Sequence, residues 1–339
     1  MAQIVFGFGS SHGPLLSTVP EKWDLRAQAD RKNPAHAYRG GTYTFDELKE
    51  LRKDERLERE IEIDVRRARH ERNQRALDRL SETLAGVNPD LVVLVGDDQH
   101  EWFHADNQPS FSIYCGDQVI NTALDEKKRA MIDPGLAISM AANHPPVDHT
   151  YPVPSALARA IIAQCIEDEF DVATSAEQPK DATGAPVGIG HAVGFIYRRI
   201  LRDRPVPVVP ILLNTFWPPN QPTPKRCYQF GQAIGKAIKG WNPNGAKRVA
   251  VCASGGISHF VVDEDFDNRM LKAIKERDTR TIFAEPNSMF QSGTSETKNW
   301  ITVAGIMSQT DFAMNLLDYV PCYRSDAGTG NAMAFATWT

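Results

Sequence analysis

"QIVFGFGSSHGPLL" (residues 3–16) joins a short apolar run to a turn that contains glycines and a histidine. A short apolar run that stops at a polar or glycine-rich turn is typical of a buried strand in a parallel sheet. The pattern covers residues 3–9 and recurs at 90–96, 206–214 and 247–256, as "DLVVLVG", "VPVVPILLN" and "KRVAVCASGG". We therefore predict four buried parallel strands.

Helical patterns lie between these strands, for example at residues 155–169 and 226–241. Strands that alternate with helices predict an α/β fold, in which a mostly parallel central sheet is flanked by helices. Neither an internal repeat nor a low-complexity linker divides the chain, so we expect one domain over residues 1–339. Residues 18–43 and 104–150 are rich in Pro, Gly, Asn and His, and we expect long ordered loops there.

Residues 44–86 are highly charged and predict one long helix or a pair of helices. Thr44 and Glu47 have the spacing of a capping box, which marks the start of a helix. Gly86 is the expected stop.

The composition is that of an ordinary soluble globular protein, with 42% hydrophobic and 24% charged residues among 339. Thirty-eight basic and 43 acidic residues give a net charge of −5, which predicts neither a nucleic-acid nor a membrane partner. No apolar run reaches the roughly 20 residues of a membrane-spanning helix. The five scattered cysteines form no C-x-x-C pair, which favours a reducing compartment, and we expect a cytoplasmic protein.

Residues 9–13 match the G-x-S-x-G pattern of a hydrolase nucleophile elbow, with Ser11 as the nucleophile. Such an elbow needs its serine above a central strand, with the acid and the histidine later in the chain. Only one strand can precede Ser11, and the short pattern also arises by chance. The serine-hydrolase interpretation is therefore the weaker one.

Histidines follow three of the four predicted strands, namely His12, His100 and His259. In open α/β sheets the ligand crevice lies beyond the carboxyl ends of the strands, so these side chains can converge there. Burying several imidazoles without partners costs free energy, which favours a shared function over three separate core histidines. Two imidazoles and one carboxylate on one face are typical of a non-haem iron site that uses oxygen.

Five motifs occur here in the order found in the type III extradiol ring-cleaving dioxygenases, which the chain resembles over most of its length. They are "SSHGPLL", "VVLVGDDQHEWF", "GIGHAVGF", "ASGGISHF" and "GTSETKNWITVAGI". The resemblance is greatest to the gallate and 3-O-methylgallate branch. It implies a ferrous iron cofactor, a catechol-type substrate and dioxygen, with the active site at the carboxyl ends of the strands.

The resemblance also implies a role for individual residues. His12, His100 and Glu296 match the three iron ligands. His259 matches the base that takes a proton from the catechol hydroxyl, and His191 matches the acid that assists oxygen intermediates.

Two departures from the family pattern concern these residues. The family reads Asp-His after the second strand, whereas a gapless match here puts Gln99 in the ligand position, so His100 requires a one-residue bulge. Glutamine is a poor iron ligand, and we therefore predict His100. The Asp-His-Gly usual at the acid is Gly190-His191-Ala192 here, so the carboxylate that orients His191 is absent or comes from elsewhere.

Relative to shorter family members, the chain carries an insertion at about residues 18–86, which we expect to cover the active site. Glu264 is an alternative carboxylate ligand, although acidic residues are also favourable at a helix N-terminus. His144 and His149 lie on a proline-rich loop that can line the entrance or the surface, and Arg324 can pair with a substrate carboxylate.

Two other functions remain open from the sequence. A zinc metallohydrolase could use the same His/His/Glu set, because these side chains also suit zinc. A non-catalytic scaffold could have kept the fold without the chemistry, although retention of all five polar residues argues against it. A symmetric homo-oligomer, such as a dimer, is the expectation from base rates.

Overall fold

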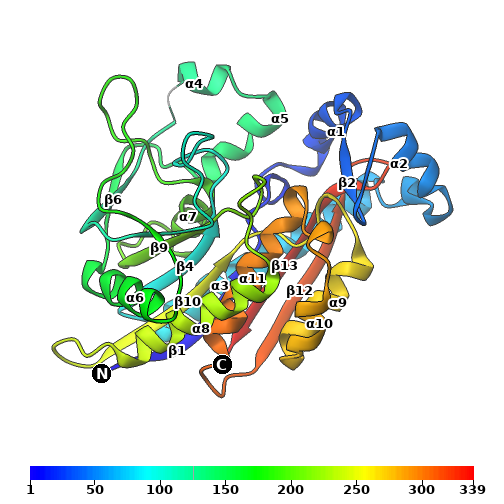
Figure 1. The fold of residues 1–339 in the computed structure, drawn as a ribbon. Coiled ribbons are helices and arrows are strands. Elements are labelled where there is room, and N and C mark those ends of the chain that lie inside the picture. The colour runs from blue at the N-terminus through cyan, green and yellow to red at the C-terminus, as the bar shows by residue number, and fades with distance from the viewer. Residues whose placement is uncertain (125) are drawn as a thin grey trace.

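Four parallel strands form the centre of a nine-stranded sheet (Figure 1). They lie in the order β1 (Ala2–Ser10), β10 (Lys247–Ser254), β4 (Leu91–Asp97) and β9 (Val208–Leu213). Each coincides with one of the four predicted apolar runs, so the predicted α/β fold with its parallel central sheet is confirmed. The computed structural model describes residues 1–124 and 126–339, without the side chains of residues 127 and 128.

Antiparallel strands extend this sheet on both sides. On one side β13 (Thr329–Trp338) pairs with β1, and both β11 (His259–Val261) and β12 (Met314–Tyr323) pair with β13. On the other side β5 (Phe111–Tyr114) runs antiparallel to β9 and parallel to β8 (Ala173–Ser175). The apolar-run pattern did not predict these flanking strands.

Helices cover both faces of the sheet, because successive residues of the central strands bury their side chains in opposite directions. In β4, Val93 and Val95 belong to one hydrophobic cluster, and Val92 and Leu94 belong to the other. Figure 1 shows helices in front of the sheet and α3 behind it. The first cluster receives α6 (Ser155–Glu167), α8 (Pro224–Gly240), α9 (Glu264–Glu276), α10 (Thr279–Ala284) and α11 (Thr297–Met307), and the second receives α3 (Ile63–Val87) and α7 (His191–Phe195).

The charged segment at 44–86 forms two helices, α2 (Phe45–Leu51) and α3, with two 3₁₀ turns between them. The predicted capping box is confirmed, because Thr44 Oγ1 accepts from the Glu47 backbone and the Glu47 side chain accepts from the Thr44 backbone. The predicted stop at Gly86 is wrong. The helix continues to Val87 and ends at Asn88, whose left-handed conformation (φ 48°) closes it.

The two regions expected to be long loops contain short elements, so that expectation is wrong. These polar stretches contain helices and strands of three to ten residues. Such elements are too short for a clear periodicity of hydrophobic residues to appear in the sequence. Region 18–43 forms α1 (Trp23–Lys32), β2 (His36–Tyr38) and β3 (Gly41–Tyr43). Region 104–150, of which residue 125 lies outside the described residues, holds β5, β6 (Gln118–Asn121), α4 (Glu126–Ala130), α5 (Pro134–Ala137) and the start of β7 (His149–Pro152).

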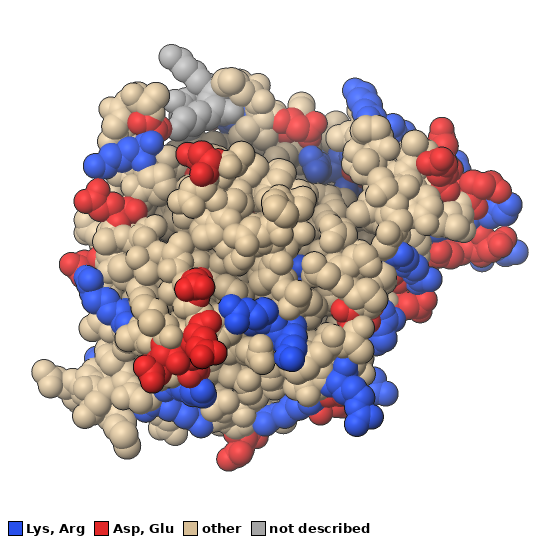
Figure 2. Space-filling view, viewed as in Figure 1, with Lys and Arg blue, Asp and Glu red and all other residues tan. Residues whose placement is uncertain are grey.

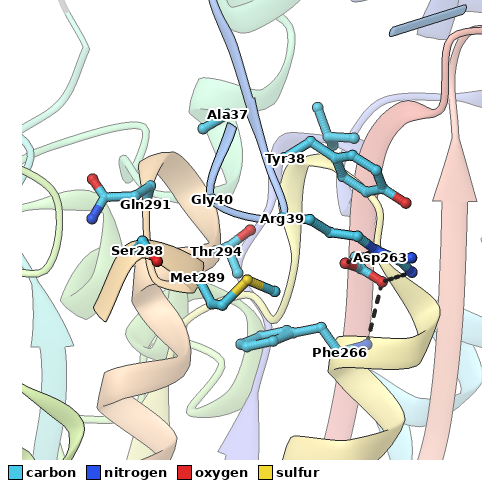
Figure 3. Close-up of a pocket in the computed structure, with 11 residues that line it drawn as sticks. Ala37, Tyr38, Arg39, Gly40, Asp263, Phe266, Ser288, Met289, Gln291 and Thr294 are labelled. Carbon is cyan, nitrogen blue, oxygen red and sulfur yellow. Dashed lines mark hydrogen bonds and ion pairs between the residues drawn. The ribbon is translucent and has the colours of Figure 1, made fainter. Parts of the chain in front are cut away.

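The β2–β3 hairpin packs against the segment that carries His259 (Figure 3). Arg39 follows β2, and its Nε and Nη2 donate to the two Asp263 oxygens at 2.8 and 2.7 Å. Arg39, Asp263 and Thr294 line one small cavity. Thr294 accepts a hydrogen bond from the His259 backbone N–H at 3.3 Å. The β2–β3 hairpin therefore packs against β11 and helps to hold it in place.

The surface visible in Figure 2 mixes acidic and basic side chains around a broad area without charge. The longest described helix, α3, has 25 residues and carries charged residues along its length. Within the described residues, we find no helix with the length and apolar character that crossing a membrane requires.

Stability is expected to depend on pH through Asp267, which is 0% exposed on α9 and accepts from the Tyr319 hydroxyl and from the Ser258 side chain and backbone. Burial raises the pKa of Asp267 to about 7, whereas an unfolded aspartate ionises near pH 4. The folded state therefore holds this proton more tightly, and the unfolding free energy falls as the pH rises toward 7. Between pH 5 and 8 the wild type should lose about 2–3 kcal/mol relative to Asp267→Asn.

Urea unfolding at the two pH values measures this difference. The exposed acid Glu276, on the same helix, provides the matched control Glu276→Gln. If both variants follow the wild type in parallel from pH 5 to 8, Asp267 does not carry the effect.

Candidate active site

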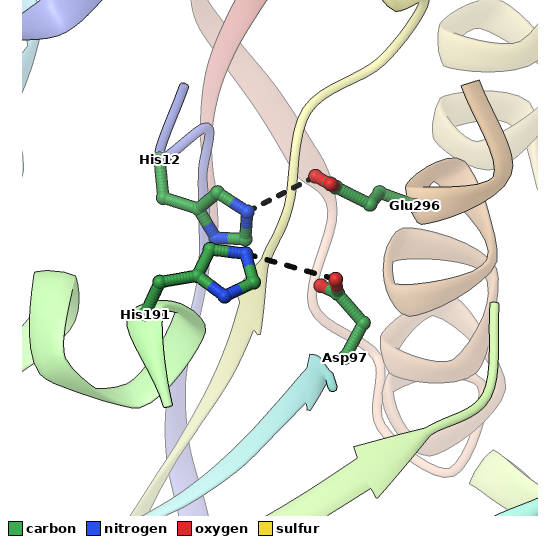
Figure 4. Close-up of side chains that lie close together, drawn as sticks. All are labelled: His12, Asp97, His191 and Glu296. Carbon is green, nitrogen blue, oxygen red and sulfur yellow. Dashed lines mark ion pairs between the residues drawn. The ribbon is translucent and has the colours of Figure 1, made fainter. Parts of the chain in front are cut away.

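Four side chains from distant parts of the chain converge at the carboxyl edge of the sheet (Figure 4). His12 follows β1, Asp97 ends β4, His191 begins α7, and Glu296 ends a 3₁₀ turn before α11. One ligand atom from each lies within 4.8 Å of the others. The parallel strands bring this about, because their carboxyl ends share one edge.

Glu296 lies at the centre of this group and is 1% exposed. Its Oε2 accepts from the Gly256 backbone at 2.7 Å and lies 3.1 Å from His12 Nε2. Its Oε1 lies 3.0 Å from His259 Nε2 and accepts from Gln99 Nε2 at 3.1 Å. Burial opposes its ionisation, but His259 and His12, when they carry a positive charge, outweigh burial and hold the pKa of Glu296 well below its usual range.

The neighbours of His12 determine which ring nitrogen carries its proton. Ser254 Oγ donates to the Ala192 carbonyl at 2.7 Å, so its oxygen accepts from His12 Nδ1 at 3.0 Å. The proton therefore lies on Nδ1, and Nε2 presents a lone pair toward Glu296. Burial lowers the pKa of His12, which favours this neutral form.

His259 has a similar arrangement. Its Nδ1 lies 3.1 Å from the Ile257 carbonyl, which can only accept, so Nδ1 carries a proton. Its Nε2 lies against Oε1 of Glu296, whereas Nε2 of His12 lies against Oε2. The sequence predicted His12, His259 and Glu296, and the structure brings all three together.

A carboxylate orients His191, and it comes from Glu101. Glu101 Oε1 lies 2.5 Å from His191 Nδ1 and accepts from the His191 backbone at 2.9 Å. Glu101 Oε2 accepts from the Gln99 backbone at 2.8 Å. Burial opposes the imidazolium, but the Glu101 carboxylate outweighs it and raises the pKa of His191 to about 10. His191 thus holds a proton.

Asp97 is a second buried carboxylate in the group. It is 0% exposed and lies 3.7 Å from His191 Nε2, and its Oδ1 accepts from Asn299 Nδ2 at 2.9 Å. Burial and the neighbouring Glu296 charge raise the pKa of Asp97 well above its usual range. Two carboxylates this close repel each other unless a cation lies between them.

His100, predicted as the second ligand, lies outside this group. The Asp98 carboxylate accepts from three backbone N–H groups, of His100, Trp102 and Phe103, and so organises a turn in which His100 has φ +65°. The His100 ring stacks on Trp217 with centroids 3.7 Å apart, and its Nε2 lies 3.0 Å from Gln108 Oε1. Asp97 and Gln99, and not His100, lie beside Glu296 at the end of β4.

The donor set fits a divalent metal ion. His12 Nε2 is buried, has no hydrogen bond with any described residue, and faces Glu296 with a lone pair. An imidazole lone pair and two carboxylates are ligands that ferrous iron, manganese and zinc all accept. The residues that could hold the ion are therefore His12, Glu296 and Asp97, with His191 beside them.

The group opens onto a cavity of about 710 Å³. Its lining includes His12, Gln99, His100, Glu101, His144, His191, His259 and Glu296. Arg26, on α1, also lines it, but no described residue of α2 or α3 does. Of the 18–86 region, which was expected to cover the active site, only the N-terminal part with α1 therefore reaches this cavity among the described residues.

Several alternative residues have other roles in the structure. Ser11 Oγ accepts from the Ala334 backbone, and no described hydrogen bond joins it to a histidine. Glu264 begins α9 and accepts from the Tyr323 hydroxyl. Arg324 is 2% exposed and forms a two-pronged pair with Asp30 at 2.5 and 2.8 Å, so Asp30 already occupies it. His149 is not among the described lining residues of the cavity.

Sequence reasoning assigned no role to Asp97, Glu101 or Arg26. A signal for Glu101 was present, because it lies in the same strand-end motif as Gln99 and two residues further on. Arg26 lies on a helix that was expected to be a loop, and no sequence pattern linked it to the cavity.

Comparison with known proteins adds a family to this geometry. The model described as "Catalytic LigB subunit of aromatic ring-opening dioxygenase" matches residues 62–328, which is more than half of the chain. The chain belongs to this family. The matched residues include Asp97, His191, His259 and Glu296, and they begin after His12.

Several curated relatives are similar to this family member. Gallate dioxygenase from Pseudomonas putida is 29% identical over 167 residues, which cover 45% of this chain and 46% of the relative. A 2,3-dihydroxyphenylpropionate/2,3-dihydroxicinnamic acid 1,2-dioxygenase from Cupriavidus necator is 27% identical over 172 residues, which cover 51% and 44%. The chain thus spans about half the length of the curated relatives it matches.

Removal of one carboxylate should weaken metal binding. Glu296→Gln keeps the size of the side chain but removes the charge that faces His12 Nε2, so the affinity for Fe(II) or Mn(II) should fall more than about 100-fold. Anaerobic titration of the metal-free protein measures the change. Glu264→Gln is the matched control and should bind as the wild type does, whereas equal affinity of both variants would contradict the assignment.

Removal of the Glu101 charge should release the proton of His191. In Glu101→Gln the pKa of His191 should fall from about 10 toward the ordinary histidine value of about 6.5 or below it. The ring signals of His191 in an NMR titration of metal-free protein report this pKa. The signals of His36, which bonds to the Asp30 carbonyl, provide an internal reference. A His191 pKa unaffected by the substitution would show that Glu101 does not stabilise the imidazolium.

Proposed function

We propose that the chain opens the ring of a catechol-type aromatic substrate with dioxygen and a ferrous iron ion held by this group. The observation that carries the proposal is the approach of His12 Nε2 to Glu296, beside Asp97, at the wall of a 710 Å³ cavity. Membership of the ring-opening dioxygenase family and the names of the relatives support it.

Within this proposal His12 and Glu296 are iron ligands, as the sequence predicted, and Asp97 is the nearest further donor. His100 would have to leave Trp217 and Gln108 to bind the same ion. When bound, ferrous iron would supply the positions at which the catechol and dioxygen meet and exchange electrons. The protein side chains supply orientation and proton transfer.

His259 and His191 would divide the proton transfers between them. His259 Nδ1 donates to the Ile257 carbonyl, and Nε2, which here lies 3.0 Å from Glu296 Oε1, would take a proton from a substrate hydroxyl once Glu296 holds the ion. His191, beside His12 and Asp97, already holds a proton, because Glu101 stabilises its imidazolium. His259 is therefore the base in this proposal and His191 the acid.

The test is anaerobic reconstitution with Fe(II), followed by oxygen uptake with protocatechuate, gallate, 3-O-methylgallate and unsubstituted catechol. We expect uptake and a ring-opened product with at least one of them, and a loss of about 10²–10⁴-fold in kcat for His259→Gln and for His191→Asn. Glu264→Gln should keep the wild-type rate. Absence of uptake with every substrate would overturn the proposal.

Two further arms examine the alternatives. Reconstitution with zinc should give no oxygen uptake, and a hydrolytic activity with zinc would favour the metallohydrolase. His100→Ala should keep the iron affinity of the wild type if His12, Glu296 and Asp97 hold the ion. A large loss of affinity in this variant would restore His100 as a ligand.

A further inference from the structure

Arg26 places a positive charge on the wall of the cavity that holds His12 and Glu296. It is the one Lys or Arg among the lining residues that the structure describes, and its side chain is 16% exposed. A guanidinium with so little exposure loses much of its hydration and needs hydrogen-bond acceptors in compensation.

The described residues give Arg26 little compensation. Its one hydrogen-bonded acid among them is Asp133, whose Oδ1 lies 3.5 Å from Nη1 and already accepts from the backbone of Gly135 and Leu136. The Nε of Arg26 is buried, and no hydrogen bond joins it to a described residue. Among the described residues, the guanidinium therefore has one hydrogen-bond acceptor, at the long distance of 3.5 Å.

Arg324 provides a comparison nearby. Its Nε and Nη2 both bind Asp30, and its Nη1 donates to Asn331 at 3.0 Å. The positive charge of Arg324 also lies close enough to Arg26 that it adds to burial in lowering the pKa of Arg26. One arginine is thus fully paired within the protein, whereas the other has the long contact to Asp133 and only the charge of Asp30, to which it is not hydrogen-bonded.

The cavity suits an aromatic ring with one charged substituent. Apolar side chains make up part of its wall, including Leu124, Leu136, Met140, Ile189 and Phe260. Two of the acids on the wall have partners of their own, because Glu101 binds His191 and Asp148 accepts from the Ala123 backbone. A planar carboxylate matches the guanidinium edge, with two parallel hydrogen bonds.

We propose that Arg26 binds the carboxylate of the substrate through its guanidinium and so selects carboxylated catechols. This inference rests on the proposed ring-opening function, which it deepens by naming a specificity-determining residue. The negative substituent supplies the acceptors that Asp133 does not, and the ring then lies in the apolar part of the cavity.

The kinetic test compares protocatechuate with 3,4-dihydroxybenzamide, which has the same shape but no charge. Arg26→Gln should raise KM for protocatechuate at least about 30-fold, because a buried charge pair loses one partner. KM for the amide and kcat for both substrates should change little. Arg26→Lys should recover part of the affinity, since it restores the charge but not the two-pronged geometry.

Arg31→Gln is the matched control, because Arg31 lies on the same helix but is exposed and does not line the cavity. It should behave as the wild type with both substrates. Equal losses of Arg26→Gln with the acid and the amide, or none with either, would overturn the inference and leave the ring-opening function standing.

Binding of 4-hydroxybenzoate, measured by calorimetry without turnover, separates the two proposals. We expect the wild type to bind it, Arg26→Gln to lose that binding, and Asp133→Asn to bind several-fold more tightly because a competing carboxylate is gone. This pattern in a protein that opens no catechol would keep the anion site and reject the proposed function. Unchanged binding in both variants would reject the anion site, and Asp133→Asn keeps the test valid if Arg26→Gln does not fold.

Discussion

The negative charge of Glu296 sits where almost no water reaches it, and the surrounding residues are arranged around that charge. One oxygen receives a backbone N–H from Gly256, and both oxygens face histidine nitrogens. A carboxylate in such a place is tolerated only with hydrogen bonds and positive charge nearby. The hydrogen bonds of His12 and His259 to Ser254 and Ile257 direct their Nε2 atoms to this one point.

The sheet explains why residues so far apart in sequence can form this arrangement. The central strands are buried on both faces, so their apolar runs are visible in the sequence and their carboxyl ends could be predicted to meet. His12 and His259 were found in this way, Glu296 was implied by the family resemblance, and the predicted α/β fold was confirmed. Strands β12 and β13 were missed, because Asn, Asp and Pro interrupt the pattern of β12 and the apolar run of β13 is short and consists mostly of alanine.

Side-chain direction beyond a strand end was harder to predict. Whether Gln99 or His100 faces the site depends on the turn that Asp98 builds with three backbone N–H groups, and on the indole of Trp217 more than a hundred residues away. The partner of His191 was likewise sought next to it in sequence, but Glu101 reaches it from another strand end. Such tertiary contacts leave no local periodicity.

The position of β1 has a consequence for how the chain folds. This first strand lies between β10 and β13, with Ala2 paired to Lys247 and Gly7 to Trp338. The buried pair of Asp30 and Arg324 likewise joins the beginning of the chain to its last strands. During synthesis β1, which precedes His12, therefore stays unpaired until β10 and β13 have left the ribosome, so this part of the sheet closes late and through non-local contacts.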